Sequence, residues 1–116
     1  MTLKMINNHS YARGEVYVVD LNPTIGSEIN KKRPCVIVGA TPINQARSTI
    51  IVVPLSSSPT PRPPLVIPLK SQGINSVAVC DQIRAIDKSR FQNKIGALTH
   101  KELDLLDDCL KQTLGL

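Results

Sequence analysis

The most apolar run in the chain is Thr49-Ile50-Ile51-Val52-Val53-Pro54-Leu55, and it strongly limits how the chain can fold. Its β-branched residues favour an extended strand. A run with no polar face is typical of a strand that is buried on both sides. Ser56 follows directly, so a hydroxyl side chain stands where this strand ends. The run therefore predicts a central β-strand around which the rest of the chain is arranged.

Shorter runs on either side predict more strands. Residues 15–21 are rich in β-branched and aromatic side chains and end at Asn22-Pro23. Residues 35–38 follow Pro34, which has no amide hydrogen to donate and so belongs at a strand start or a sheet edge. Later strands are predicted at residues 65–69 and 77–86, on either side of a turn at Gly73. Surface loops are predicted at residues 24–33 and 57–64.

The C-terminal segment changes to a helical period. Thr99 and Glu102 have the spacing of a capping box, and Leu98 and Leu103 fit the hydrophobic staple around it, so a helix should begin at Thr99. One apolar stripe follows at three- and four-residue steps, made of Leu103, Leu106, Leu110 and Leu114. The predicted fold class is mainly β, with a mostly antiparallel sheet and a C-terminal helix that covers it.

A chain of 116 residues is long enough for one compact core. We expect a single domain over residues 12–116 and a flexible N-terminal lead-in over residues 1–11, which lack periodicity. No stretch approaches the roughly 20 apolar residues of a membrane span, and the N-terminus lacks the apolar core of a signal peptide. The expected localisation is cytoplasmic, without membrane contact. The three widely spaced cysteines predict reduced thiols rather than a disulfide framework.

The charge of the chain is unevenly distributed. Residues 99–116 carry two lysines against four carboxylates, so residues 1–98 carry twelve cations against five anions, a net +7. A basic face of this kind is suited to a polyanion such as RNA. The alternative is a basic surface that only keeps the protein in solution.

The sequence offers little for metal or cofactor chemistry. His9 and His100 are the only histidines, and no Cys, His or carboxylate cluster has the spacing of metal ligands, so we expect no metal and no cofactor. Glycine-rich phosphate loops are absent as well. The three aromatic residues are too few for the stacking platforms of common RNA-binding sheets. If RNA binds, arginines, backbone groups and polar side chains must hold it.

Two polar clusters are candidates for that role. The first runs from Glu28 through Lys31 and Lys32 to Arg33, just before Pro34. Such a charge run is often only a solvated loop, but Arg33 is fixed next to rigid structure, where a guanidinium can grip phosphate through two hydrogen bonds. The second cluster is Asp81-Gln82-Ile83-Arg84, which by itself is equally compatible with a strand that turns polar side chains to solvent.

These residues together resemble a known family. Arg13-Gly14-Glu15-Val16-Tyr17, Asp20-Leu21-Asn22-Pro23, Gly26-Ser27-Glu28 and Arg33-Pro34 are similar, in order and spacing, to the opening of the MazF/PemK toxins. The segment Asp81-Gln82-Ile83-Arg84-Ala85-Ile86-Asp87 resembles the second signature of that family. The resemblance extends from about Arg13 to the end of the chain.

The resemblance implies an SH3-like barrel of the CcdB/MazF type, a homodimer, and a toxin endoribonuclease that cleaves single-stranded mRNA and is neutralised by a cognate acidic antitoxin. It implies attack by the RNA 2′-hydroxyl, which leaves a 2′,3′-cyclic phosphate and a 5′-hydroxyl without a metal. The implied catalytic residues are Arg33, Ser56 and Asp81. The implied substrate-binding residues are Glu28, Lys31, Lys32, Gln82 and Arg84.

The chain departs from the family pattern at two positions. Many members have Thr in place of Ser56, and a branch that uses the signature Asp in catalysis has Arg in place of Val79. The general base is therefore open between Asp81 and Glu28. Two other functions compete. One is a CcdB-like gyrase poison, which uses a Trp near its C-terminus that this chain lacks, and the other is a non-enzymatic SH3-like binding module or a decayed toxin.

Overall fold

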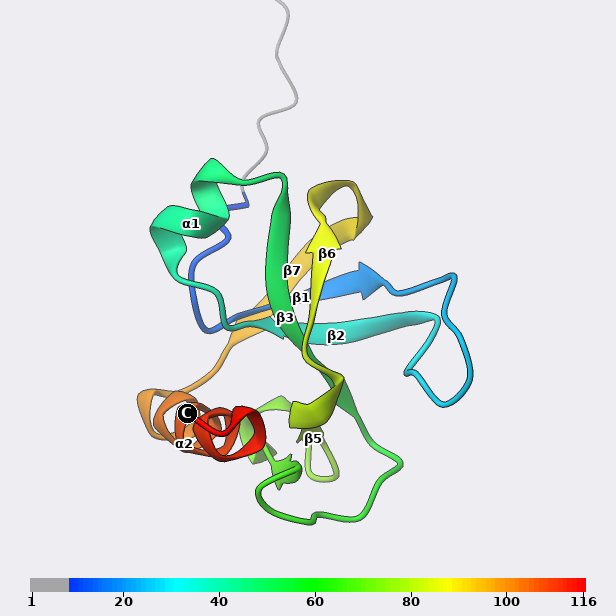
Figure 1. Cartoon of the computed structure of the whole chain (residues 1–116), viewed down its shortest axis with the longest axis vertical. Coiled ribbons are helices and arrows are strands. Elements are labelled where there is room, and N and C mark those ends of the chain that lie inside the picture. Colours follow the sequence, from blue (N-terminus) through cyan, green and yellow to red (C-terminus); the bar gives the residue numbers. More distant parts are fainter. Residues whose placement is uncertain (1–8) are drawn as a thin grey trace, which may run out of the picture.

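The structure is a computed structural model, and it describes residues 9–116 (Figure 1). The described residues form a strongly twisted sheet with one long and one short α-helix. In chain order the principal elements are β1 (Glu15–Asp20), β2 (Lys32–Ile37), α1 (Thr41–Ala46), β3 (Thr49–Ser56), β4 (Val66–Pro68), β5 (Val77–Val79), β6 (Arg84–Asp87), β7 (Phe91–Ala97) and α2 (His100–Leu114). Short 3₁₀ turns are η1 (Lys70–Gln72), η2 (Cys80–Gln82) and η3 (Lys88–Arg90).

The strand β3 lies at the centre of the sheet, as its sequence predicts. The strand order is β4-β5-β3-β2-β1-β7, with β6 also paired to β3, and every pairing is antiparallel. The first half of β3 pairs with β6 and β2, and its last two residues pair with β5. Figure 1 shows β1 and β2 running across the direction of β3, with β6 beside it. The predicted mainly β, mostly antiparallel fold is confirmed, although in residues 9–116 no ladder joins β6 to β7 to close the barrel.

Alternate side chains of β3 enter two different cores, which explains why the run is apolar on both faces, although Ile51 is 44% exposed and belongs to neither core. Val53 and Leu55 belong to a core under α2, together with residues of β4 and β5. Ile50 and Val52 belong to a second core on the other face, with Tyr17 of β1. Successive strand residues point to opposite faces, so a strand that separates two cores needs apolar residues on both faces.

The C-terminal helix begins where the sequence predicts. The Glu102 amide donates to Thr99 Oγ1 at 3.1 Å and the Thr99 amide donates to Glu102 Oε1 at 3.2 Å, which completes the capping box. Leu106 and Leu110 are buried against the first core. Leu114 is 50% exposed, so the predicted stripe reaches beyond the surface that the sheet covers.

The segment predicted as one strand at residues 77–86 is divided in two. β5 pairs with the end of β3 and β6 with its beginning, and η2 forms the corner between them. The prediction of a continuous strand is wrong because the polar pair Asp81-Gln82 lies in this corner rather than on a strand face.

β7 was not expected from the sequence. It pairs only with β1 at the end of the strand order, and among its residues only Phe91 is buried. An exposed edge strand needs little apolar sequence, so its residues carry no clear strand pattern.

Pro34 lies within β2, opposite Val18 of β1. The pairing of β2 with β3 starts only at Cys35, so Pro34 is at a position where β2 has one neighbouring strand. This agrees with the predicted edge position, because the missing amide hydrogen costs no ladder hydrogen bond there.

The predicted lead-in over residues 1–11 falls mostly on residues 1–8, which lie outside the described part of the chain. Of the remainder, Ser10 Oγ donates to the Glu15 carboxylate at 2.7 Å. Tyr11 is buried, and its ring centroid lies 5.7 Å from that of Tyr17 and 5.5 Å from that of Phe91. The chain is thus packed from Ser10 onward, because Tyr11 supplies part of the second core.

All three cysteines are free and buried, as expected for reduced thiols. Burial raises the pKa of Cys35 and of Cys80 to about 12. Both thiols are therefore protonated at neutral pH and poor nucleophiles. No helix in residues 9–116 combines the length and apolar character needed to cross a bilayer.

Candidate active site

Arg33 and Ser56 come from adjacent strands and line the same pocket. Cys35 of β2 pairs with Pro54 of β3 in antiparallel register. Arg33 lies two residues before this pair on β2 and Ser56 two residues after it on β3, so both leave the ladder at the same end. The pocket between them has a volume of about 240 Å³. Its lining residues are Arg33, Pro34, Leu55, Ser56, Ser57, Gln72, Gly73, Asn75 and Ser76.

The Arg33 side chain is half-buried at the start of β2. Its Nε donates to the Asn30 carbonyl at 3.2 Å, which fixes the guanidinium against the end of the β1–β2 loop. Within residues 9–116, no protein group accepts a hydrogen bond from its Nη1 or Nη2. The two terminal nitrogens can therefore donate together to an anion such as phosphate.

Ser56 ends β3 and is also half-buried. Its Oγ accepts a hydrogen bond from the Ser58 amide at 3.3 Å, which orients the hydroxyl at the point where the chain turns away from the sheet. A hydroxyl that accepts one hydrogen bond still has a proton to donate. Ser56 can thus donate to an oxygen of the anion that Arg33 binds.

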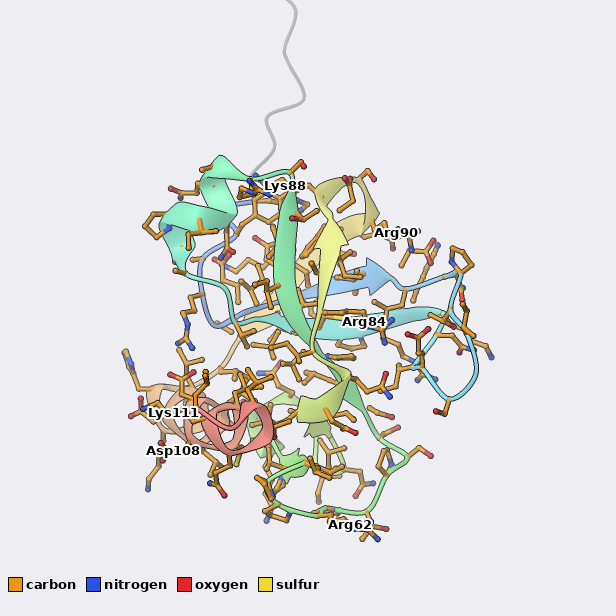
Figure 2. The ribbon with its side chains drawn as sticks, in the orientation of Figure 1. Arg62, Arg84, Lys88, Arg90, Asp108 and Lys111 are labelled. Carbon is orange, nitrogen blue, oxygen red and sulfur yellow. The ribbon has the colours of Figure 1, made fainter. Side chains whose placement is uncertain are left out.

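Asp81 and Gln82 line a different pocket. This second pocket has a volume of about 620 Å³ and shares no lining residue with the first. Arg62, on the loop after β3, also lines this pocket and lies at the bottom of Figure 2. The structure therefore does not bring Asp81 into the pocket that contains Arg33 and Ser56.

Gln82 and Arg84 hold the β1–β2 loop. The Ile29 amide donates to Gln82 Oε1 at 3.2 Å, and Arg84 Nη2 donates to the Ile29 carbonyl at 3.1 Å. Arg84 Nη2 also donates to Gln82 Oε1 at 3.2 Å, which links the two side chains. Figure 2 shows Arg84 beside β2, toward this loop. Both residues are thus engaged with loop backbone just before Arg33.

The remaining predicted site residues lie on the loop itself. Glu28 is exposed, and its Oε1 accepts a hydrogen bond from the Ile25 amide at 2.7 Å. Lys31 and Lys32 are exposed at the point where the loop enters β2. The Lys31 backbone has a φ of 67°, held by a hydrogen bond from its amide to Asn22 Oδ1 at 3.0 Å. These cations extend the positive surface that begins at Arg33.

The other side of the first pocket was not identified from the sequence. It is formed by Gln72 and Gly73 at the end of η1 and by Asn75 and Ser76 before β5. In residues 72–76 the sequence predicts only a turn at Gly73 and gives no indication of a binding site. Its approach to Ser56 depends on the pairing of Ser56 with Val77, which is not visible in the sequence. Within residues 9–116, no group of three His, Cys, Asp or Glu side chains could hold a metal ion.

Comparison with known proteins matches residues 12–114 to the family described as PemK-like, MazF-like toxin of type II toxin–antitoxin systems. Endoribonuclease MazF9 of Mycobacterium tuberculosis is 36% identical in an alignment 113 residues long, which covers 90% of this chain and 96% of that protein. Endoribonuclease EndoA of Bacillus subtilis is 35% identical over 112 residues, covering 90% and 94% of the two chains.

Solved structures share the fold. MazF from Deinococcus radiodurans superposes with a TM-score of 0.81 at 20% identity, over 94% of this chain and all of the other. An endoribonuclease from a mycobacterial species, solved in complex with its cognate antitoxin, gives a TM-score of 0.76 at 22% identity, over 90% and 95% of the two chains.

Proposed function

Because the chain belongs to the PemK-like, MazF-like toxins of type II toxin–antitoxin systems, we propose that it is an endoribonuclease that cleaves single-stranded mRNA in the Arg33–Ser56 pocket. One observation carries the assignment of the site. The guanidinium of Arg33 at the start of β2 and the hydroxyl of Ser56 at the end of β3 line one pocket. Both have hydrogen-bond donors that the described protein groups do not use and that can bind a phosphate. Family membership favours this activity over the gyrase poison and the binding module that the sequence left open.

The pocket suits cleavage by the RNA's own 2′-hydroxyl. The 2′-oxygen bonds to phosphorus while the bond from phosphorus to the 5′-oxygen breaks, which leaves a 2′,3′-cyclic phosphate and a 5′-hydroxyl. Arg33 donates to the phosphoryl oxygens, where negative charge builds up in the transition state. It also donates a hydrogen bond to the leaving 5′-oxygen, which takes up a proton from solvent water as its bond to phosphorus breaks. Ser56 holds the phosphate in line for the attack.

A base must take the proton from the 2′-hydroxyl. The candidates are Asp81 in the second pocket and Glu28 on the β1–β2 loop, and neither lines the first pocket. Separate Asp81→Asn and Glu28→Gln variants distinguish them. The variant that loses the acidic limb of the pH–rate profile, where the rate rises as the base loses its proton, identifies the base.

Substrate binding draws on the cations around the pocket. Lys31 and Lys32 are exposed next to Arg33 and are suited to phosphates on either side of the cut. Gln82 and Arg84 contribute by fixing the loop that carries these lysines. Glu28, also on that loop, is a further candidate for contact with the RNA bases.

We infer a homodimer from an apolar groove at the end of α2. Its apolar lining includes Ile51, Ile83, Leu110, Leu114 and Leu116, around a volume of about 410 Å³. Ile51 is 44% exposed and Leu116 is 87% exposed, so one copy of the chain leaves apolar surface for a second. Sedimentation as a monomer at micromolar concentration would contradict this inference.

Type II toxins act together with an antitoxin, and we propose an acidic one for this chain. A flexible acidic segment would complement the +7 of residues 1–98 and cover the Arg33–Ser56 pocket. Both the antitoxin and mRNA are encountered in the cytoplasm, the expected location. A cognate antitoxin that binds but leaves cleavage intact would refute this mode of inhibition.

The decisive experiment incubates the purified chain with a defined single-stranded RNA and maps the new ends by sequencing. Arg33→Ala serves as the control for contaminating nucleases. Cleavage by the wild-type chain and not by Arg33→Ala supports the proposal. Equal cleavage by both proteins, or no cleavage by either, would contradict it.

A further inference from the structure

A separate slot adjoins the Arg33–Ser56 pocket. It has a volume of about 380 Å³ and shares three lining residues with that pocket, Ser57, Asn75 and Ser76. A strand of RNA whose phosphate lies between Arg33 and Ser56 therefore has this slot directly beside it. The slot has the volume of a small-ligand site.

Five of the residues that line the slot are apolar. They are Pro59 and Pro61 on the loop after β3, together with Pro68, Ile74 and Val77. Ile74 is 84% exposed, so it adds nothing to either core of the protein. Together with Pro59, Pro61 and Pro68 it forms a group of apolar side chains at one slot, and grouped apolar side chains at a surface are typical of a site that contacts a ligand.

Polar groups at the slot are unused by the protein. In the described part of the chain, no hydrogen bond engages the side chains of Asn75, Ser57, Ser76 or Lys70. The Asn75 amide offers a donor and an acceptor side by side. Lys70 is the one cation among the residues that line the slot.

This chemistry matches a nucleobase. A base has apolar faces and an edge of donors and acceptors, and an asparagine amide can bond to one edge through two hydrogen bonds, as it does with adenine. Aromatic stacking is not available here, because Tyr11, Tyr17 and Phe91 are all buried in the second core. The proline rings and Ile74 supply van der Waals contact with the base instead.

We propose that this slot is a base-reading subsite of the ribonuclease. It takes the base of a nucleotide next to the cleaved bond, Asn75 reads the edge of that base, and Lys70 binds the adjoining phosphate. The inference rests on the proposed function, and it assigns to one residue, Asn75, part of the sequence preference of the enzyme.

The test is a pool of RNAs with randomised bases around the cut site, digested by the wild type and by variants, with the cleavage ends sequenced. Asn75→Ala should reduce the base preference at one position by about tenfold and leave the preference elsewhere unchanged. Ile74→Ser should weaken the preference at that same position. The matched control is Asn93→Ala, an exposed asparagine on β7 at the other end of the strand order, which should change neither rate nor preference.

Two results would overturn the subsite. One is an Asn75→Ala enzyme whose base preference equals that of the wild type at every position. The other is an equal slowing on all sequences, which would mean that Asn75 does not distinguish bases.

A second measurement separates this proposal from the proposed function. The side-chain amide resonances of Asn75 are followed by NMR while a short single-stranded RNA, 2′-deoxy throughout the cut region, is titrated in. If the wild type cuts no RNA but these resonances shift, the ribonuclease assignment fails and the subsite stands. If the resonances do not shift, the subsite is refuted whatever the nuclease assay gives.

Discussion

The Glu15 carboxylate at the start of β1 lies 2.7 Å from Lys94 Nζ of β7 and is buried in the protein. It also accepts hydrogen bonds from Ser10 Oγ, the Ala12 amide and the Tyr17 hydroxyl, at 2.7, 2.8 and 2.9 Å. Burial alone raises the pKa of Glu15, but Lys94 and the other donors more than offset this and lower it to about 2. The charged carboxylate is therefore what holds the described N-terminal residues against β1 and β7.

Acid should destabilise the protein through Glu15. Because its pKa is lowered from 4.5 to about 2, the stabilisation is complete above pH 4.5 and is lost as pH falls from 4.5 toward 2. The loss should be about 2–3 kcal/mol in the free energy of unfolding. Urea denaturation at a series of pH values measures it. Glu15→Gln should be less stable at pH 7 and show a flatter dependence over this range, whereas parallel curves would contradict the assignment.

Arg33→Ala should abolish cleavage and leave the fold intact. The side chain makes one hydrogen bond to the protein, through Nε, so its loss affects neither core. Removal of a donor to transition-state charge typically costs about 100-fold or more in rate. Arg33→Lys should recover little, because lysine keeps the charge but lacks the planar pair of donors. Single-turnover cleavage and thermal melting test both statements, and a folded Arg33→Ala enzyme with near-normal activity would disprove the site.

Ser56→Ala should slow cleavage less than Arg33→Ala. A neutral hydroxyl that orients phosphate contributes about one hydrogen bond, which corresponds to roughly tenfold in rate. Ser56→Thr should remain active, since it keeps the hydroxyl at the end of β3. The same single-turnover assay ranks the three variants, and a Ser56→Ala enzyme as inactive as Arg33→Ala would instead give the hydroxyl a direct role in proton transfer.

Arg84→Met should loosen the β1–β2 loop. Methionine keeps much of the side-chain length but cannot donate to the Ile29 carbonyl or to Gln82. We expect faster hydrogen exchange at the Ile29 amide and a higher KM, with a smaller change in kcat, because the loop carries Lys31 and Lys32. Arg47→Ala, an exposed arginine after α1, is the control. Unchanged exchange at Ile29 would show that the loop is held by other contacts.

The sequence predicts the parts of this molecule whose patterns are local. The β-branched run of β3 and the capping box at Thr99 each specify their own element, and both are confirmed. The division of residues 77–86 at η2 and the edge strand β7 depend on long-range pairing, and the sequence missed them. A corner and an exposed edge are set by which strand lies alongside, and that information is spread over distant residues.

The candidate site shows the same difference between what local sequence patterns predict and what long-range strand pairing decides. Arg33 and Ser56 both lie just beyond the same end of the β2–β3 ladder and line one pocket, and the family resemblance rather than their spacing in the sequence indicates them. Asp81 was expected with them, but the corner at η2 places it in the neighbouring pocket. Asn75 carried no signal in the sequence, because only the pairing of β5 with β3 brings it to the pocket.

Cleavage should persist in excess EDTA and should fail on RNA whose ribose at the cut site is 2′-deoxy. The first expectation follows from the sequence, in which no Cys, His or carboxylate cluster has metal-ligand spacing. The second follows from the proposed attack, because the 2′-oxygen is the nucleophile and no water molecule replaces it.

A matched RNA with its single 2′-deoxy sugar three nucleotides away should be cut normally, which separates loss of the nucleophile from a general effect on binding. Mass spectrometry of the products should give a 2′,3′-cyclic phosphate on one fragment and a 5′-hydroxyl on the other. Cutting at the 2′-deoxy position would mean that water or an enzyme group attacks phosphorus, and the roles of Arg33 and Ser56 would then have to be assigned to a hydrolytic reaction.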